Sequence, residues 1–316
     1  MTLDNIKEEI LKANSIVILT HENPDGDAIG SSIAMYIALS RLGKNPDMII
    51  PEFPKLYSFL PFADKALKEG KKDVYDLAIA VDSATIDRLN GWSNYFENAK
   101  SKIVIDHHAS NTMYGDLNFV NPDSPACCQI LINIIEYLGV EIDQELGTCI
   151  LTGIITDTGG FQYQSTRPET FEFAAELLKK GVNVSDIYKK TMNTKSKVNF
   201  ELRKRAFDRM EFFENNKIAF TYITKQDEEE LNAIQDDHEG IVDEGRAIEG
   251  VEVSIFVRET DTGYRLSLRS NEYVNVSDAC MIFGGGGHMH AAGCNIVAQN
   301  IEQVKEKIIN QIKTYI

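Results

Sequence analysis

Short apolar runs recur through the first half of the chain. They lie at residues 15–19, 48–50, 77–81 and 103–105. Buried parallel strands read as such continuous runs. Apolar residues with the three- and four-residue spacing of a half-buried helix lie between and after them, over 29–42, 129–138, 145–156 and 168–180. The alternation predicts an α/β fold with a mostly parallel sheet and helices on both faces.

The pattern changes near residue 217. Strand-like runs follow at 218–223, 251–257 and 264–268, with an acidic helical segment at 227–236. The 316 residues favour two domains. We expect the first over 1–185, a helical connector over 186–214, and a smaller α/β domain over 215–316. We also expect a functional site in the cleft between the two domains.

The stretch from Thr20 to Ser31 lies between the first predicted strand and the first predicted helix. It carries one imidazole and two carboxylates, on His21, Asp25 and Asp27. Open α/β sheets bind ligands at the carboxyl ends of their strands. A metal-binding loop is one interpretation. The other is a capping loop, with Asp27 as the helix N-cap and Asp25 in an Asx turn.

Three further sequence positions repeat this arrangement. Asp82 directly follows one strand-like run, Asp106-His107-His108 directly follows the next, and Asp157 ends a predicted helix. Each aspartate alone is explained by helix capping, and the histidine pair by backbone hydrogen bonds. Because parallel strands end at a shared edge, however, we expect these residues to converge with those of the first loop.

Several carboxylates at one place would repel one another unless a cation lay among them. Two divalent ions would resolve that conflict. Mixed imidazole and carboxylate ligation fits Mn²⁺, Fe or Zn better than Mg²⁺ or Ca²⁺. Two such ions, about 3.5–4 Å apart, activate a bridging water and stabilise the attacking and leaving oxygens of phosphoryl hydrolysis.

The second predicted domain carries candidate anion-binding groups. Leucines alternate with Arg265, Ser267 and Arg269 as in a half-buried strand. Arg269 could bind a phosphate through two parallel hydrogen bonds. For Arg265, a surface salt bridge is as good an explanation as any other. The glycine run 284–287, followed by His288, exposes successive N–H groups to an anion. The alternative for this run is an ordinary flexible loop.

Composition and charge bear on whether the protein binds long nucleic acids or a membrane. The net charge of −16 and the absence of a visible basic face argue against long nucleic acids. No apolar run approaches the roughly 20 residues that span a bilayer, and the first ten residues resemble an acidic amphipathic helix, so we expect a cytoplasmic protein without a membrane partner. The five cysteines form no CxxC pair and are expected to be reduced and buried.

These motifs, taken in order, resemble those of the DHH phosphoesterase superfamily and its associated C-terminal domain. The matching stretches are His21-x-x-Pro24-Asp25-Gly26-Asp27, Val81-Asp82-Ser83, Asp106-His107-His108, Thr156-Asp157-Thr158-Gly159, Ser267-Leu268-Arg269-Ser270 and Gly284-Gly285-Gly286-Gly287-His288-x-x-Ala291-Ala292-Gly293. Any one motif is weak, but six in order are specific. The resemblance covers nearly the whole chain and makes 1–185 the catalytic domain and 215–316 the substrate-binding domain.

The resemblance also implies roles. One metal would be held by His21, Asp25 and Asp82. The other would be held by Asp27, Asp82, His107 and Asp157, with Asp82 bridging the two. His108 would face the substrate phosphate or leaving group, although a role in orienting a ligand also fits it, and Asp106 would orient an imidazole. The substrate would be held by Arg269, Gly285, Gly286, Gly287 and His288.

Within the superfamily, the two-domain chain most resembles bifunctional oligoribonucleases, or nanoRNases, that also hydrolyse 3′-phosphoadenosine 5′-phosphate (pAp). The expected substrates are therefore pAp and very short RNA or DNA oligonucleotides, and long duplexes are not expected. The resemblance leaves open pApA hydrolysis in cyclic-di-AMP turnover, a RecJ-like single-strand exonuclease, a family II inorganic pyrophosphatase, and a non-catalytic nucleotide sensor. A homodimer is compatible with the sequence, which does not fix the oligomeric state.

Overall fold

The structure is a computed structural model that describes residues 3–316. The chain divides into two compact units, one up to Thr194 and one from Lys195. This division falls inside the segment 186–214 that we expected to be a connector. Each unit has its own sheet and its own hydrophobic core.

The first unit is built on a six-stranded sheet in which every pair of neighbours is parallel. In spatial order the strands are β3 (Ala66–Leu67), β2 (Asp47–Ile49), β1 (Ile16–Leu19), β4 (Leu77–Val81), β5 (Ser101–Asp106) and β6 (Leu117–Val120). The predicted parallel sheet is confirmed, while β3 and β6 were not predicted. Both are edge strands with half-buried residues, so they lack the long apolar run of a central strand.

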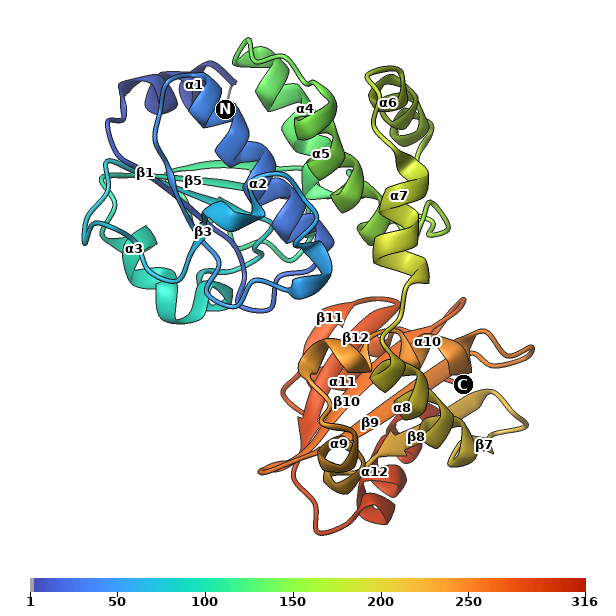
Figure 1. The fold of residues 1–316 in the computed structure, drawn as a ribbon. Helices are drawn as coiled ribbons and strands as arrows, with labels where there is room; N and C mark the ends of the chain where they lie inside the picture. Colours follow the sequence, from blue (N-terminus) through green and yellow to red (C-terminus); the bar gives the residue numbers. More distant parts are fainter. Residues whose placement is uncertain (1–2) are drawn as a thin grey trace. The chain divides into compact units, whose positions relative to one another are not determined.

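Helices cover both faces of this sheet (Figure 1). One face packs against α1 (Leu3–Lys12), α2 (Gly26–Arg41), α4 (Cys127–Tyr137) and α5 (Gln144–Asp157). The other packs against the 3₁₀ segment η3 (Ile86–Trp92) and α3 (Ser93–Glu97). Smaller elements complete the unit: η1 (Lys55–Tyr57), η2 (Ala63–Lys65), α6 (Pro168–Lys179), α7 (Val184–Tyr188) and the π-helical turn η4 (Lys189–Asn193).

The strand order changes direction between β1 and β4. From β1 the chain builds outward through β2 and β3, and then returns to place β4, β5 and β6 on the other side. The loops after β1 and β4 therefore leave the sheet toward opposite faces. In open α/β sheets the crevice at this switch point is where ligands bind.

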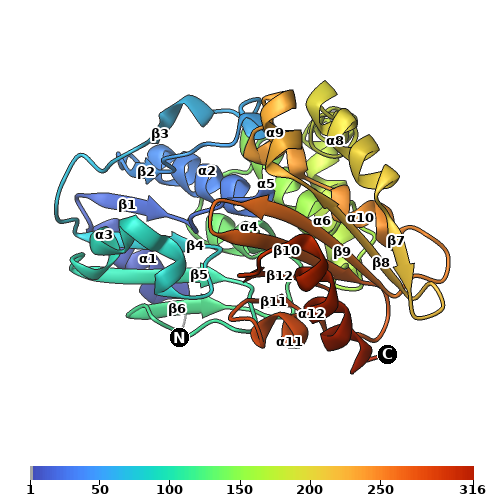
Figure 2. The same cartoon turned by 90° about the horizontal axis from the view of Figure 1, so that it is seen from below.

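The second unit contains a mixed six-stranded sheet (Figure 2). In spatial order its strands are β11 (Gly286–His288), β12 (Ala291–Ile296), β10 (Gly263–Ser270), β9 (Val253–Thr260), β8 (Ile218–Ile223) and β7 (Glu211–Phe213). Only β8 and β9 run parallel to each other. The core lies on the face covered by α11 (Val276–Met281) and α12 (Ile301–Lys313).

The opposite face of this sheet is covered only over part of its width. Near β8 and β9, residues of α8 (Lys197–Asp208) and α10 (Ile241–Arg246) form a smaller apolar cluster around Phe256. Two short helical elements follow β8, namely α9 (Lys225–Leu231) and η5 (Gln235–His238). Toward β10 and β12 the side chains on this face are half-buried or exposed.

Two helical predictions were wrong in part. The segment 186–214 is not one helix, because the chain becomes extended at Thr194 and restarts α8 at Ser196, whose side chain accepts the amide of Asn199. Its last residues form β7, which pairs with β8. The helix expected over 227–236 begins earlier and stops at Asn232, which has a left-handed φ of 50°.

Two other expectations concern the whole chain. All five cysteines are free and buried, as predicted. Within residues 3–316, no helix combines the length and the apolar character needed to cross a bilayer.

Candidate metal centre

The loop between β1 and α2 places three predicted ligands at the carboxyl edge of the sheet. His21 is buried and Asp25 is exposed. Asp25 is the N-cap of α2, because its Oδ1 accepts the amides of Asp27 at 3.0 Å and Ala28 at 3.1 Å. The capping alternative was therefore right that Asp25 forms an Asx turn, through the amide of Asp27, but wrong in assigning the N-cap to Asp27. Capping uses only one oxygen of Asp25, so it does not exclude a metal contact through the other.

Asp27 is held by the first turn of α4. Its side chain is 1% exposed, and its two oxygens accept the amides of Cys127 at 2.5 Å and Cys128 at 2.9 Å. These amides belong to the positive end of the helix dipole, which stabilises a carboxylate. This support was not predicted, because the partners lie about a hundred residues from Asp27 in the chain.

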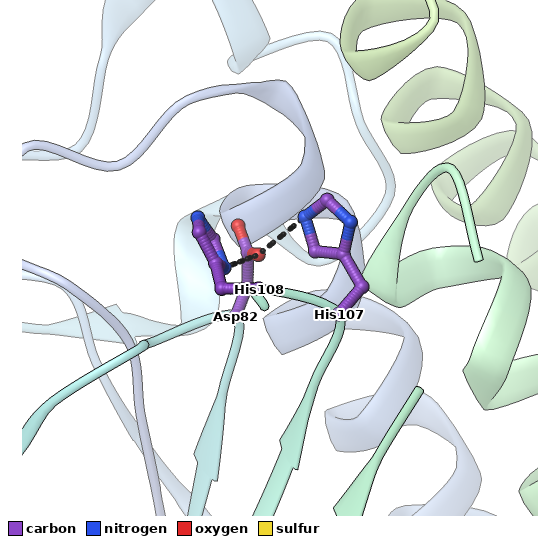
Figure 3. Close-up of side chains that lie close together, drawn as sticks. All are labelled: Asp82, His107 and His108. Atoms are coloured by element: carbon purple, nitrogen blue, oxygen red, sulfur yellow. Dashed lines mark ion pairs between the residues drawn. The ribbon is translucent and has the colours of Figure 1, made fainter. Parts of the chain in front are cut away.

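Asp82 lies at the centre of the cluster. It follows β4 with a left-handed φ of 52°, and its amide donates to the carbonyl of Ile105 on β5. A non-glycine residue in this region is strained and is typical of functional sites. Its Oδ1 lies 3.4 Å from His107 Nε2 and 3.6 Å from His108 Nδ1 (Figure 3), and its Oδ2 lies 3.8 Å from His21 Nε2.

His107 is oriented by the main chain. Its Nδ1 lies 3.2 Å from the carbonyl oxygen of Ser124, which fixes this nitrogen as the donor. Nε2 is thereby directed at the carboxylates, at 3.4 Å from Asp157 and 3.9 Å from Asp27. An imidazole whose distal N–H is held by a carbonyl is the usual arrangement of a metal-ligating histidine.

His108 is oriented by a side-chain network instead. Its Nδ1 lies 2.7 Å from Oδ1 of the fully buried Asp106. The second oxygen of Asp106 accepts the amide of Asn111 at 2.6 Å, and this amide also reaches the carbonyl of Ser83. Asn111 was not predicted, although it lies only three residues beyond the histidine pair.

The electrostatics of the cluster are strained. Burial, together with the charge of Asp82, raises the pKa of Asp27 to about 7. Burial also raises the pKa of Asp157 well above its ordinary value. Burial would raise the pKa of Asp82 as well, but the adjacent imidazole of His107 holds it below its ordinary value. The carboxylates thus compete for the positive charge of one imidazole, and a divalent cation would remove that conflict.

The donor atoms fit metal ions. Three groups each bring one donor atom per residue within 4.8 Å of the others: His21 with Asp25 and Asp82; Asp27 with His107 and Asp157; Asp82 with His107 and His108. The contacts of 3.4–3.9 Å between imidazole nitrogens and carboxylate oxygens exceed hydrogen-bond length. Ligands that each lie about 2.1 Å from one shared ion are separated by roughly 3–3.5 Å.

The predicted ligand set therefore converges. His21, Asp25, Asp27, Asp82, His107 and Asp157 all belong to these groups, and Asp82 and His107 each belong to two of them. The role of each residue toward a metal remains a prediction.

The predicted substrate residues lie in the second unit, on adjacent strands. Arg269 is on β10 and pairs with Ala291 on β12, which pairs with His288 on β11. Directly paired residues share a face, so Arg269 and His288 lie in one row. The Arg269 guanidinium donates to the carbonyl of Leu268, and its Nε lies 3.8 Å from Asp243.

The glycine run differs from the expected series of exposed amides. The N–H of Gly284 donates to Met281 and that of Gly285 to Cys280, because these glycines end helix α11. A Cβ on Gly285 would lie 2.2 Å from the carbonyl oxygen of Gly293, so this glycine is required for packing. Gly286 faces open space, and packing does not explain it.

Comparison with known proteins agrees with this architecture. Residues 15–154 match the model of the DHH family, N-terminal domain, and residues 215–314 match the DHHA1 domain. The bifunctional oligoribonuclease and PAP phosphatase NrnA of Thermus thermophilus is 33% identical over 96% of this chain and 92% of that protein.

Two solved structures are also similar. The crystal structure of an exopolyphosphatase-related protein from Bacteroides fragilis aligns with a TM-score of 0.93 at 28% identity, covering 99% of this chain and 96% of that one. RecJ of Thermus thermophilus in complex with Mn²⁺ shares the fold, with a TM-score of 0.55 at 14% identity, over 99% of this chain and 54% of RecJ. This chain belongs to the DHH family and carries a DHHA1 domain.

Proposed function

We propose that this protein is a metal-dependent phosphoesterase that hydrolyses very short oligonucleotides to mononucleotides and pAp to AMP and phosphate. The observation that carries the proposal is the convergence of buried carboxylates and imidazoles at the switch point of a parallel sheet. The 33% identity to a protein named bifunctional oligoribonuclease and PAP phosphatase supports the substrate class.

Two divalent ions, most simply Mn²⁺, fit the donor set. One would be held by His21, Asp25 and Asp82, and the second by Asp27, His107 and Asp157 with Asp82 shared between them. When bound, such ions neutralise the charge of a phosphoester and lower the pKa of an attacking water. Mn²⁺ is preferred over Mg²⁺ because the set includes imidazole nitrogens.

The surrounding residues position the reacting groups. The carbonyl of Ser124 fixes the tautomer of His107, and the amides that open α4 fix the carboxylate of Asp27. Asp106 holds Nδ1 of His108, which makes Nε2 the nitrogen that can exchange a proton with the leaving oxygen. In the second unit, Arg269 would bind a substrate phosphate.

Small substrates are consistent with the charge of the chain. At a net charge of −16, a long polyanion would be repelled, because such ligands are bound by neutralising many phosphates. A dinucleotide or pAp needs only a local positive field, which the ions and a few arginines supply.

The test is Mn²⁺-dependent turnover of labelled dinucleotides, pApA and pAp in one buffer. We expect release of mononucleotides and of phosphate, and loss of both with a chelator. Absence of release above background from dinucleotides and pAp would refute the proposal. Turnover of pApA alone would identify a dinucleotide phosphodiesterase instead.

A further inference from the structure

A second pair of arginines lies on the same sheet face as Arg269. Arg265 on β10 is directly paired with Arg258 on β9 and with Asn295 on β12. Residues two and four positions apart on a strand share a face, so Arg265 and Arg269 point to the same side. This side is opposite the buried Leu266 and the core under α12.

Arg265 and its direct partner Arg258 form an unusual like-charged pair. Two equal charges directly opposite each other in an antiparallel pair are destabilising. The Arg265 side chain is exposed, and within the described part of the chain its guanidinium has no hydrogen bond or ion pair. A surface salt bridge, the alternative considered for Arg265, is therefore not observed.

Arg258, in contrast, is held in place. Its guanidinium donates to Gln235 Oε1 at 3.2 Å, lies 3.1 Å from His238 Nδ1, and lies 3.5 Å from Glu228 Oε1. Glu228 also contacts His238 Nε2 at 2.8 Å, so its charge is shared. Burial lowers the pKa of Arg258, the charge of Glu228 opposes this effect, and the nearby charge of Arg265 lowers the pKa further. The pair thus keeps an excess of positive charge on an acidic protein.

Small residues separate two rows of paired residues on this face, one containing Arg265 and the other containing Arg269. Ser267 lies between Arg265 and Arg269 on β10 and pairs with Gly293 on β12, and both positions are half-buried. On its other side Ser267 pairs with Phe256 on β9, which α8 and α10 cover, so the small residues leave room for an extended ligand on the β12 side of β10. Four residues of strand span about 13 Å, whereas a stacked single strand advances about 3.4 Å per nucleotide. The rows are therefore separated by about four stacked nucleotides, and by fewer in a stretched chain.

We infer that Arg265, backed by Arg258 and Asn295, binds a backbone phosphate of an oligonucleotide, at a second subsite along the strand from Arg269. This inference rests on the proposed function and sharpens its substrate class. The exposed fork of Arg265 can hold a phosphate through two hydrogen bonds, and the phosphate would relieve its repulsion with Arg258. The subsite favours oligonucleotides of several residues over pAp, which is too short to reach both rows.

The experiment compares Arg265→Ala with the wild-type protein on pAp and on a pentanucleotide. We expect the ratio of kcat/KM for the pentanucleotide to that for pAp to fall about tenfold. The slope of the logarithm of the pentanucleotide binding constant against the logarithm of the salt concentration should become less negative by about 0.7. This is the contribution of one phosphate contact on a single strand. Arg265→Lys keeps the charge without the fork and should recover part of the loss.

Lys307→Ala is the matched control, because it removes one exposed positive charge from α12 on the opposite side of the sheet. It should leave the ratio unchanged. An unchanged ratio in Arg265→Ala, or an equal loss on both substrates, would overturn the subsite while leaving the proposed function intact.

A wild-type protein that hydrolyses neither substrate would refute the proposed function instead. The subsite is then tested by fluorescence anisotropy of a labelled pentanucleotide in the presence of a chelator. A shallower salt dependence in Arg265→Ala supports it, and an unchanged affinity and salt dependence overturn it.

Discussion

The two units of this chain present their functional side chains in opposite ways. In the first unit, Asp27 and Asp82 are 1% and 2% exposed, and backbone groups from other strands and helices fix the cluster around them. In the second unit, Arg265, Arg269 and His288 project from a sheet face that is only partly covered. The first arrangement suits chemistry that needs fixed distances, and the second suits recognition of ligands that differ in length.

The largest expected effect comes from the centre of the first region. Asp82→Ala should reduce kcat by more than about a hundredfold, because loss of a residue that merely orients a ligand already costs 10- to 100-fold. It should also remove bound Mn²⁺, since Asp82 belongs to two of the three donor groups. Turnover of a dinucleotide and metal stoichiometry after dialysis measure both effects. Asp116→Ala, which removes an exposed carboxylate before β6, is the control. Full metal occupancy in Asp82→Ala would contradict the bridging role.

A smaller loss of kcat is expected from a residue that supports the cluster without belonging to the proposed ligands. Asn111→Ala removes the amide that holds Asp106, which in turn holds His108. We expect kcat to fall about 10- to 100-fold while the Mn²⁺ stoichiometry is retained, because Asn111 contacts none of the proposed ligands. Asn133→Ala, at an exposed position on α4, is the control. Loss of metal together with activity would show that Asn111 supports the whole cluster rather than His108.

The same contrast explains what the sequence could and could not predict. The convergence of these carboxylates and imidazoles was predictable because they lie in the loop after a strand-like run, directly after such a run or at the end of a helix, and parallel strands bring their ends to one edge. The amides of Cys127 and Cys128 were not, since their contact with Asp27 spans about a hundred residues of chain. No local pattern encodes such a contact.

The second unit was predicted less well for a related reason. Its strands β11 and β12 are rich in glycine and alanine, and their pairing comes from long-range register rather than from an apolar run. The glycine run therefore suggested a loop of free amides, whereas Gly284 and Gly285 end a helix. An exposed side chain such as Arg265 contributes nothing to a pattern of buried residues, so that pattern does not predict its partner.

The recognition face gives the next prediction. Arg269→Ala should raise KM for phosphate-terminated substrates about tenfold and change kcat little, because the side chain is expected to bind substrate rather than the reacting atoms. Kinetics on pAp with saturating Mn²⁺ measure the two constants separately. Lys313→Ala removes a charge from α12 on the core side of the same sheet and is the control. An unchanged KM would leave Arg269 with structural contacts alone, to Asp243 and the carbonyl of Leu268.

The smallest expected effect distinguishes packing from recognition within the glycine run. Gly285→Ala should lower the free energy of unfolding by about 1–3 kcal/mol, because its Cβ would meet the carbonyl of Gly293 at 2.2 Å. Gly286→Ala has open space, so its change should stay within about 0.5 kcal/mol. If a ligand approaches this backbone, the same methyl group should still raise KM for pAp several-fold. Urea unfolding and steady-state kinetics on the two variants separate the effects. A Gly286→Ala protein with wild-type KM would mean that the substrate does not approach the backbone at this strand.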